Sequence, residues 1–110
     1  APARGEQLIS SAIGACLGCH SIRGNPRMIG SIGPNLTHIG SRTTIAAGLY
    51  PNDTRHLALW LKNARMMKAG VLMPTLGMNQ YDPVTKTTMK AGGLTDQQIA
   101  DLVAYLQALK

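Results

Sequence analysis

The sequence predicts a single all-α domain that covers residues 1–110 and contains about three to five helices. Two stretches, residues 57–64 and 99–109, place apolar side chains at helical spacing, and no stretch shows a convincing strand alternation. The material for a core is poor, because the 110 residues include no Phe and one Trp. A domain of this size buries a limited share of its surface and usually needs an additional stabilising group beyond its hydrophobic core.

The motif Cys16-Leu17-Gly18-Cys19-His20 indicates what this additional stabilising group is. The pattern C-x-x-C-H is the attachment site of a c-type haem, in which two thiols add to the vinyl groups of one porphyrin edge and the His becomes the proximal iron ligand. A zinc site is one alternative, but it needs four N or S ligands, and only the distant His38 and His56 remain. A thioredoxin-like pair would need alternating strands and helices. We therefore expect one covalently bound haem c.

The first helix is expected over Gly5–Ala15, where apolar residues recur at helical spacing and lead into the motif. The segment from Ser21 to Gly48 is rich in Gly and turn residues and has little periodicity, which favours an irregular wrap around the cofactor. Within it, Gly33-Pro34 is a turn signal, and a rigid carbonyl there is a candidate partner for the second ring nitrogen of the iron-binding His.

Three basic side chains lie in this wrap. Arg42 is a candidate partner for a haem propionate. Arg23 and Arg27 follow the haem motif closely, so they are expected near the haem edge or, alternatively, in solvent.

A second helix is expected to begin at Pro51-Asn52-Asp53-Thr54, with Asn52 or Asp53 as its cap. Its apolar stripe comprises Leu57, Trp60, Leu61 and Ala64. Trp60 is interpreted as a core residue or as a residue at the haem rim whose indole N–H reaches a propionate. We expect His56, in the first turn, at the surface.

A sixth iron ligand is needed if the iron is to shuttle electrons, and a thioether raises its reduction potential relative to a second His. Six Met are present, and a buried Met is more often packing than a ligand. Pro74 favours an extended conformation at Met73, and Gly70 provides a hinge. Both features suit a segment, the Met73-Pro74-Thr75 strap, that carries a ligand across the face of the haem. Met73 is therefore the main candidate, and Met78 is its rival.

The segment Thr75–Gly93 is expected to be a surface excursion that contains a short hairpin. The last helix has the clearest signals: Thr95 and Gln98 form a capping box. Its predicted buried stripe comprises Ile99, Leu102, Val103, Leu106 and Leu109. Tyr105 is expected to contact the first helix.

The formal net charge is +6, and nine of the eleven Lys and Arg lie between Arg23 and Lys90. Such charge steers a domain onto an acidic partner, so we expect a redox protein with an acidic docking surface as electron donor. Nucleic acid is disfavoured, because no binding motif and few aromatic residues are present. No apolar run approaches the length of a membrane span. The start at Ala1 without Met is expected of a processed product or an excised fragment.

Taken together, these residues resemble a class I cytochrome c domain. The resemblance covers most of the chain and rests on the C-x-x-C-H motif, Gly33-Pro34, Met73-Pro74 and the final amphipathic helix. It implies that His20 and Met73 are the axial ligands and that the Pro34 carbonyl is the partner of the His20 ring. It also implies packing of the first helix against the last. The segment Thr75–Gly93 is longer than the family usually has.

A narrower resemblance is carried by Gly33-Pro34-Asn35-Leu36-Thr37-His38-Ile39-Gly40-Ser41-Arg42, Trp60-Leu61-Lys62-Asn63 and Lys68-Ala69-Gly70-Val71-Leu72-Met73-Pro74. These stretches are similar to the cytochrome c domain at the C-terminus of subunit II of caa-type haem-copper oxygen reductases. The resemblance implies that the chain is one domain of a larger membrane-anchored subunit. It also implies that the domain passes electrons to a dinuclear copper centre in that subunit.

The expected function is therefore outer-sphere transfer of one electron, in a domain that has no catalytic residue and is not an enzyme by itself. The expected location is the periplasm or the extracytoplasmic face of the cytoplasmic membrane, and the isolated domain is expected to be a monomer. One alternative is a free soluble shuttle between respiratory complexes. Another is a haem peroxidase or gas-sensing domain with an open iron position.

Overall fold

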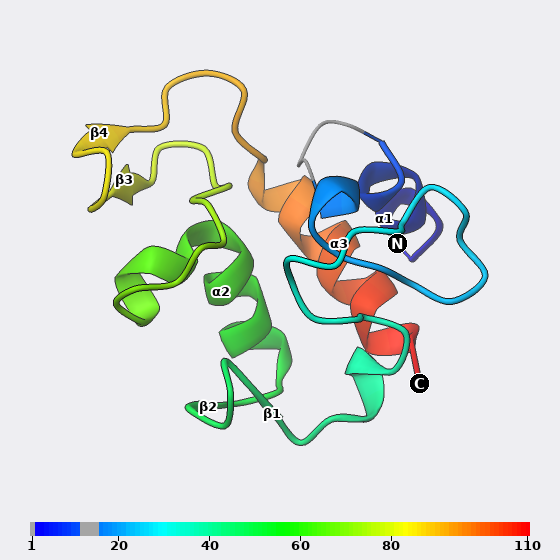
Figure 1. Cartoon of the computed structure of the whole chain (residues 1–110). Coiled ribbons are helices and arrows are strands. Elements are labelled where there is room, and N and C mark those ends of the chain that lie inside the picture. Colours follow the sequence, from blue (N-terminus) through cyan, green and yellow to red (C-terminus); the bar gives the residue numbers. More distant parts are fainter. Residues whose placement is uncertain (1, 12–15) are drawn as a thin grey trace. The chain divides into compact units, whose positions relative to one another are not determined.

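The computed structural model describes residues 2–11 and 16–110, and its helical character confirms the predicted all-α class (Figure 1). In this described part the α-helices are α1 (Pro2–Ile9), α2 (Thr54–Met67) and α3 (Asp96–Ala108), and two short 3-10 turns are η1 (Cys16–Gly18) and η2 (Ile39–Ser41). Four two-residue strands form two antiparallel pairs: β1 (Thr44–Ile45) with β2 (Tyr50–Pro51), and β3 (Tyr81–Asp82) with β4 (Thr87–Thr88).

The chain divides into two compact units. The first unit comprises residues 1–42 and 100–110, and the second comprises residues 43–99. The boundary falls inside α3, so this helix contributes residues to both units. Among the helices of the described residues, none combines the length and the apolar character that crossing a bilayer requires.

Helix α1 differs from the predicted first helix, because it begins at Pro2 and ends at Ile9. Pro is well suited to a first helical turn, where its missing N–H costs no hydrogen bond. Gly5 is buried inside the helix, and a Cβ added there would lie 2.7 Å from the Cβ of Tyr105. The expected contact of Tyr105 with the first helix is thus confirmed. The rest of the predicted helix, residues 12–15, lies outside the described residues.

Polar contacts, as well as apolar packing, hold together the two chain segments of the first unit. Arg4 donates from Nε and Nη2 to the two carboxylate oxygens of Asp101, at 3.0 and 3.1 Å. The Asp101 side chain is only 4% exposed, so this two-pronged pairing supplies the partner that a buried charge needs. Beyond the C-terminal end of α3, the carbonyl of Lys110 accepts from Ser41 Oγ at 2.9 Å and lies 3.0 Å from His38 Nδ1. The middle of α3 is therefore tied to α1, and the residue that ends the chain is tied to η2 and its N-cap.

The segment Ser21–Gly48, predicted as an irregular wrap without sheet, is irregular up to η2, but its last part contains the short strand β1. The irregular part is held by isolated β-bridges. Ser21 pairs with Ile29 in antiparallel fashion and with Asn35 in parallel fashion. Apolar side chains along the segment are buried beneath it: Ile22, Met28, Leu36 and Ile39. The segment is thus a folded wrap with its own share of the core.

In the second unit, α2 begins as predicted. The Asp53 carboxylate accepts the backbone N–H of His56 at 2.7 Å, which is N-cap geometry. That hydrogen bond is the largest of the effects that lower the pKa of Asp53. His56, expected at the surface, is half-buried there: its side chain is 23% exposed, contacts the Asp53 carboxylate through Nδ1 at 2.8 Å and stacks on the Tyr50 ring. Leu57, Leu61 and Ala64 form the buried stripe.

The expected short hairpin in Thr75–Gly93 is confirmed as β3–β4, with Tyr81 opposite Thr88 and Asp82 opposite Thr87. The capping box of α3 is confirmed too, because Gln98 N–H donates to Thr95 Oγ1 at 3.2 Å and Thr95 N–H donates to Gln98 Oε1 at 2.9 Å. The predicted stripe of α3 is buried from Ile99 to Leu106, and Leu109 is half-buried.

Candidate functional site

The C-x-x-C-H motif folds as one tight turn. The backbone N–H groups of Cys19 and His20 both donate to the Cys16 carbonyl, at 3.1 and 2.9 Å. Both cysteines are half-buried, and neither thiol takes part in a disulfide. Burial raises the pKa of the Cys16 thiol, with a backbone hydrogen bond partly opposing it. The neighbouring Cys19 also raises the pKa of Cys16, so the two thiols of the motif lie close enough to influence each other.

The orientation of the His20 ring is set by the loop that follows. Its Nδ1 lies 2.7 Å from the Pro34 carbonyl oxygen, and because a carbonyl only accepts, Nδ1 carries the proton. In a neutral imidazole the lone pair is then on Nε2, the atom free to bind a metal. The predicted contact between the motif and the Gly33-Pro34 turn is therefore present in this structure.

Gly33 lies directly against the His20 ring. A Cβ at this position would come within 2.7 Å of Nδ1 and 2.9 Å of Nε2, distances too short for a side chain. The Gly33 N–H also donates to the Cys19 carbonyl at 2.6 Å, and the Gly30 N–H donates to the His20 carbonyl at 3.0 Å. The sequence signalled a turn here, but it did not reveal that Gly33 makes room for the ring.

Arg42 supports the same loop from η2. Its guanidinium Nη2 donates to the Asn35 carbonyl at 2.8 Å, next to Pro34 in the chain. The predicted pairing of Arg42 with a haem propionate stays a prediction. Arg23 and Arg27, also predicted near the haem edge, are both exposed.

The first unit thus brings together five of the predicted site residues: Cys16, Cys19, His20, Pro34 and Arg42. Trp60 and Met73 belong to the second unit, as does the rival ligand Met78. Trp60 is half-buried on α2, and both methionines are half-buried as well. Burial alone therefore does not separate Met73 from Met78.

The donor set fits a haem better than a metal ion bound by protein side chains alone. In the described parts of the chain, no three His, Cys, Asp or Glu side chains come close enough together to hold a metal ion. The turn instead offers two thiols and one imidazole with a fixed ring tautomer. That set matches a macrocycle that brings four nitrogen ligands of its own and needs two anchors and one axial ligand.

Comparisons with known proteins agree with this fit. The sequence model of the family described as "Cytochrome c" matches residues 2–110. Among solved structures, a chain of SoxXA from P. pantotrophus is similar to this one, with a TM-score of 0.71 and 28% sequence identity. That similarity covers 99% of this chain and 81% of the SoxXA chain. Among curated proteins, none matches the sequence significantly.

Proposed function

Because the chain belongs to the cytochrome c family, we propose that it carries single electrons through one haem c whose iron is bound by His20 and Met73. Members of this family hold a covalently bound haem c and transfer electrons without being catalysts themselves. The expected class I cytochrome c fold is confirmed by the family match and by the similarity to SoxXA. The observation that carries the assignment of His20 is the 2.7 Å contact of its Nδ1 with the Pro34 carbonyl.

Each residue of the turn has a separate task in this proposal. When bound, the haem supplies an iron that alternates between the ferric and ferrous states. Cys16 and Cys19 anchor the porphyrin edge by thioether bonds. The Pro34 carbonyl fixes the His20 ring and increases the electron density on Nε2. Gly33 provides the space in which that ring lies.

Met73 is proposed as the sixth ligand because Pro74 keeps it out of helical conformation and Gly70, with a φ of +83°, allows the chain to turn before it. The test is the methionine-to-iron charge-transfer band of the ferric protein in Met73→Ala and Met78→Ala variants. We expect Met73→Ala to abolish the band and Met78→Ala to keep it. The reverse pattern would assign the iron to Met78. Carbon monoxide binding to the ferrous wild-type protein would instead indicate an open iron position and a peroxidase or sensor.

For the electron acceptor, we propose the dinuclear copper centre of a haem-copper oxygen reductase, with this chain as the cytochrome domain of subunit II. The support is the sequence resemblance over residues 33–42, 60–63 and 68–74. The donor would be a redox protein with an acidic surface, because the middle of the chain is strongly basic. Since cytochromes c are typically extracytoplasmic, the domain would work in the periplasm or on the outer face of the cytoplasmic membrane.

A second candidate is favoured by the similarity to SoxXA, which extends over 99% of this chain. In that case the chain would have the redox partner of a SoxXA-like protein, not an oxidase. A free soluble shuttle is the remaining alternative.

One experiment separates these partners: a haem stain of denaturing gels from membrane and soluble fractions of the source cells, with an antibody to this chain. A haem-stained membrane band much larger than this chain's 11.7 kDa would support the oxidase subunit. A soluble band near that mass would contradict it. Native purification of the soluble form would then distinguish a SoxXA-like complex, which retains a second protein, from a free shuttle.

A further inference from the structure

Helix α2 is interrupted near its end by a buried asparagine. Asn63 is 6% exposed and has a φ of −160° and a ψ of 73°, so its backbone is not helical. Its Oδ1 accepts the backbone N–H of Met66 at 3.3 Å. This is the bond that an N-cap residue makes with the third residue of a helix, so Asn63 begins a new final turn over residues 64–67. The carbonyl of Lys62, just before the break, accepts the N–H of Gly77 at 2.9 Å.

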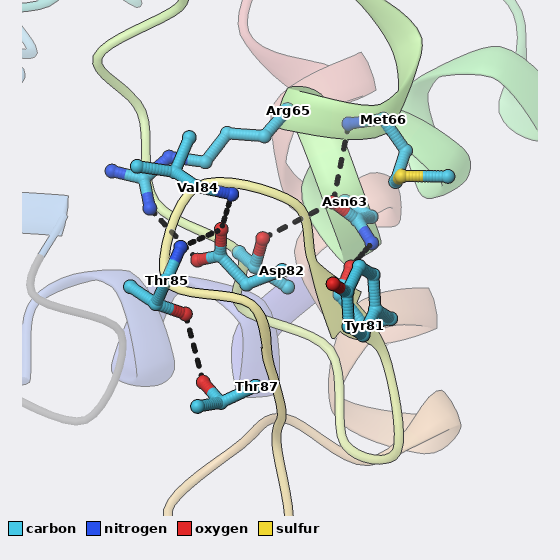
Figure 2. Close-up of polar contacts among 9 residues, drawn as sticks. Asn63, Arg65, Met66, Tyr81, Asp82, Val84, Thr85 and Thr87 are labelled. Carbon is cyan, nitrogen blue, oxygen red and sulfur yellow. Dashed lines mark hydrogen bonds and ion pairs between the residues drawn. The ribbon is translucent and has the colours of Figure 1, made fainter.

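The same side chain also holds two segments that are distant in sequence. Asn63 Oδ1 accepts a second hydrogen bond from Thr75 Oγ1 at 3.1 Å, between two buried residues. Asn63 Nδ2 donates to the Tyr81 carbonyl at 2.7 Å, and Figure 2 shows this contact beside the one with Met66. One amide therefore links the end of α2, the residue that follows Met73-Pro74, and strand β3.

The final turn of α2 secures the hairpin by a second contact. Arg65 Nη1 donates to Asp82 Oδ2 at 2.7 Å, and Asp82 Oδ1 accepts the N–H groups of Val84 and Thr85 (Figure 2). Burial raises the pKa of Asp82, but these N–H groups and the guanidinium together outweigh it and hold the pKa below its usual range. The hairpin is thus locked to the short turn that the Asn63 break creates.

A methionine ligand needs such support more than a histidine ligand does. His20 fixes its own ring through Nδ1, whereas a thioether has no N–H with which to orient itself. The position of Met73 must then come from the backbone on either side of it. On the N-terminal side, Gly70 turns the chain at a φ of +83°. On the C-terminal side, the buried Thr75 is held by its hydrogen bond to Asn63.

We propose that Asn63 is a positioning residue for the axial methionine, acting through Thr75. Its amide holds the Met73-Pro74-Thr75 strap in the place where Met73 reaches the iron. This inference rests on the proposed ligation by Met73.

The test uses the ferric holoprotein and imidazole, which replaces a weakly held methionine on the iron. The variant is Thr75→Val, which removes one hydroxyl and keeps the shape of the side chain. Asn63 Oδ1 retains the bond from the Met66 N–H, so the change leaves that oxygen with a partner. We expect the apparent affinity for imidazole to rise about threefold to tenfold, the effect of one lost hydrogen bond. Thr75→Ser, which retains the hydroxyl, should restore the wild-type affinity.

The matched control is Thr87→Val, because the Thr85–Thr87 hydroxyl contact of 2.7 Å is exposed and outside the Asn63 contacts. It should leave the imidazole affinity unchanged. If Thr75→Val lowers the midpoint of guanidinium unfolding but leaves the imidazole affinity at the wild-type value, the residue is only structural and the inference is overturned. The Met73→Ala spectrum separates the two proposals: if it keeps the charge-transfer band, the assigned ligand is wrong, independently of what Thr75 does.

Discussion

Replacing Gly5 by Ala tests how tightly α1 packs on α3 in the first unit. The added Cβ would overlap the Asp101 carbonyl oxygen and lie 2.7 Å from the Cβ of Tyr105. Neither atom belongs to the flexible end of a side chain, so one helix must move relative to the other. The substitution therefore tests backbone contact and not side-chain adjustment.

Two effects of opposite sign decide the magnitude. Ala is better than Gly inside a helix by about 1 kcal/mol. Overpacking at a close contact costs about 1–3 kcal/mol, and displacement of α1 also weakens the pairing of Arg4 with Asp101. We expect a net loss of about 1–2 kcal/mol in the free energy of unfolding. In a domain of this size that loss lowers Tm by roughly 4–15 °C.

The assay is thermal and guanidinium unfolding of the ferric holoprotein, followed by circular dichroism. Gln7→Ala is the control, because Gln7 is exposed on the same helix and its replacement changes helix propensity without adding an atom to the contact with α3. A Gly5→Ala protein as stable as the wild type, or more stable, would refute the close approach of the two helices.

Three further predictions address the site and its surroundings. Gly33→Ala should displace the His20 ring and weaken its hydrogen bond to the Pro34 carbonyl. We expect the reduction potential of the haem to rise by up to about 60 mV, which is the one-electron equivalent of one strong hydrogen bond. A potentiometric titration that finds an equal or lower potential would contradict this. Asp82 has a lowered pKa in the folded state, so its contribution to stability is complete above the unfolded pKa of about 3.9 and is lost as the pH falls through the lower folded value. The free energy of unfolding should therefore fall less between pH 7 and pH 3 in Asp82→Asn than in the wild type. If the two proteins lose stability in parallel, Asp82 does not have this role. Charge reversal at the exposed Arg23 and Arg27 should slow electron delivery from an acidic donor, most strongly at low salt. If stopped-flow rates at low salt stay unchanged, these residues are not part of the docking surface.

Features that depend on neighbouring residues could be predicted from the sequence. The cap of α2 at Asp53 and the capping box of Thr95 and Gln98 each involve residues three positions apart, so the pattern contains all of the information. The turn of Cys16 to His20 is equally local.

The contact of His20 with the Pro34 carbonyl, 14 residues away, was expected from the family resemblance, but other features that depend on distant partners were missed. The apolar stripe of α2 continues through Asn63, so periodicity gives no sign of the break there. The reasons for the break, Thr75 and Tyr81, lie 12 and 18 residues away. The first helix was expected to begin at Gly5, yet Gly5 lies inside α1, where contact with α3 favours the smallest residue.

The division of the first unit into two pieces has a consequence for how the protein is made. A chain is synthesised from its N-terminus, so residues 1–42, with both cysteines, exist before residues 100–110 that complete their unit. The intervening 57 residues, Thr43–Ile99, take about 3–11 s at ordinary rates of translation. During that interval the first unit lacks its C-terminal piece, so the two thiols belong to an incomplete fold. The order of segments along the chain therefore means that the first unit completes its fold only after the last residues of the chain are made.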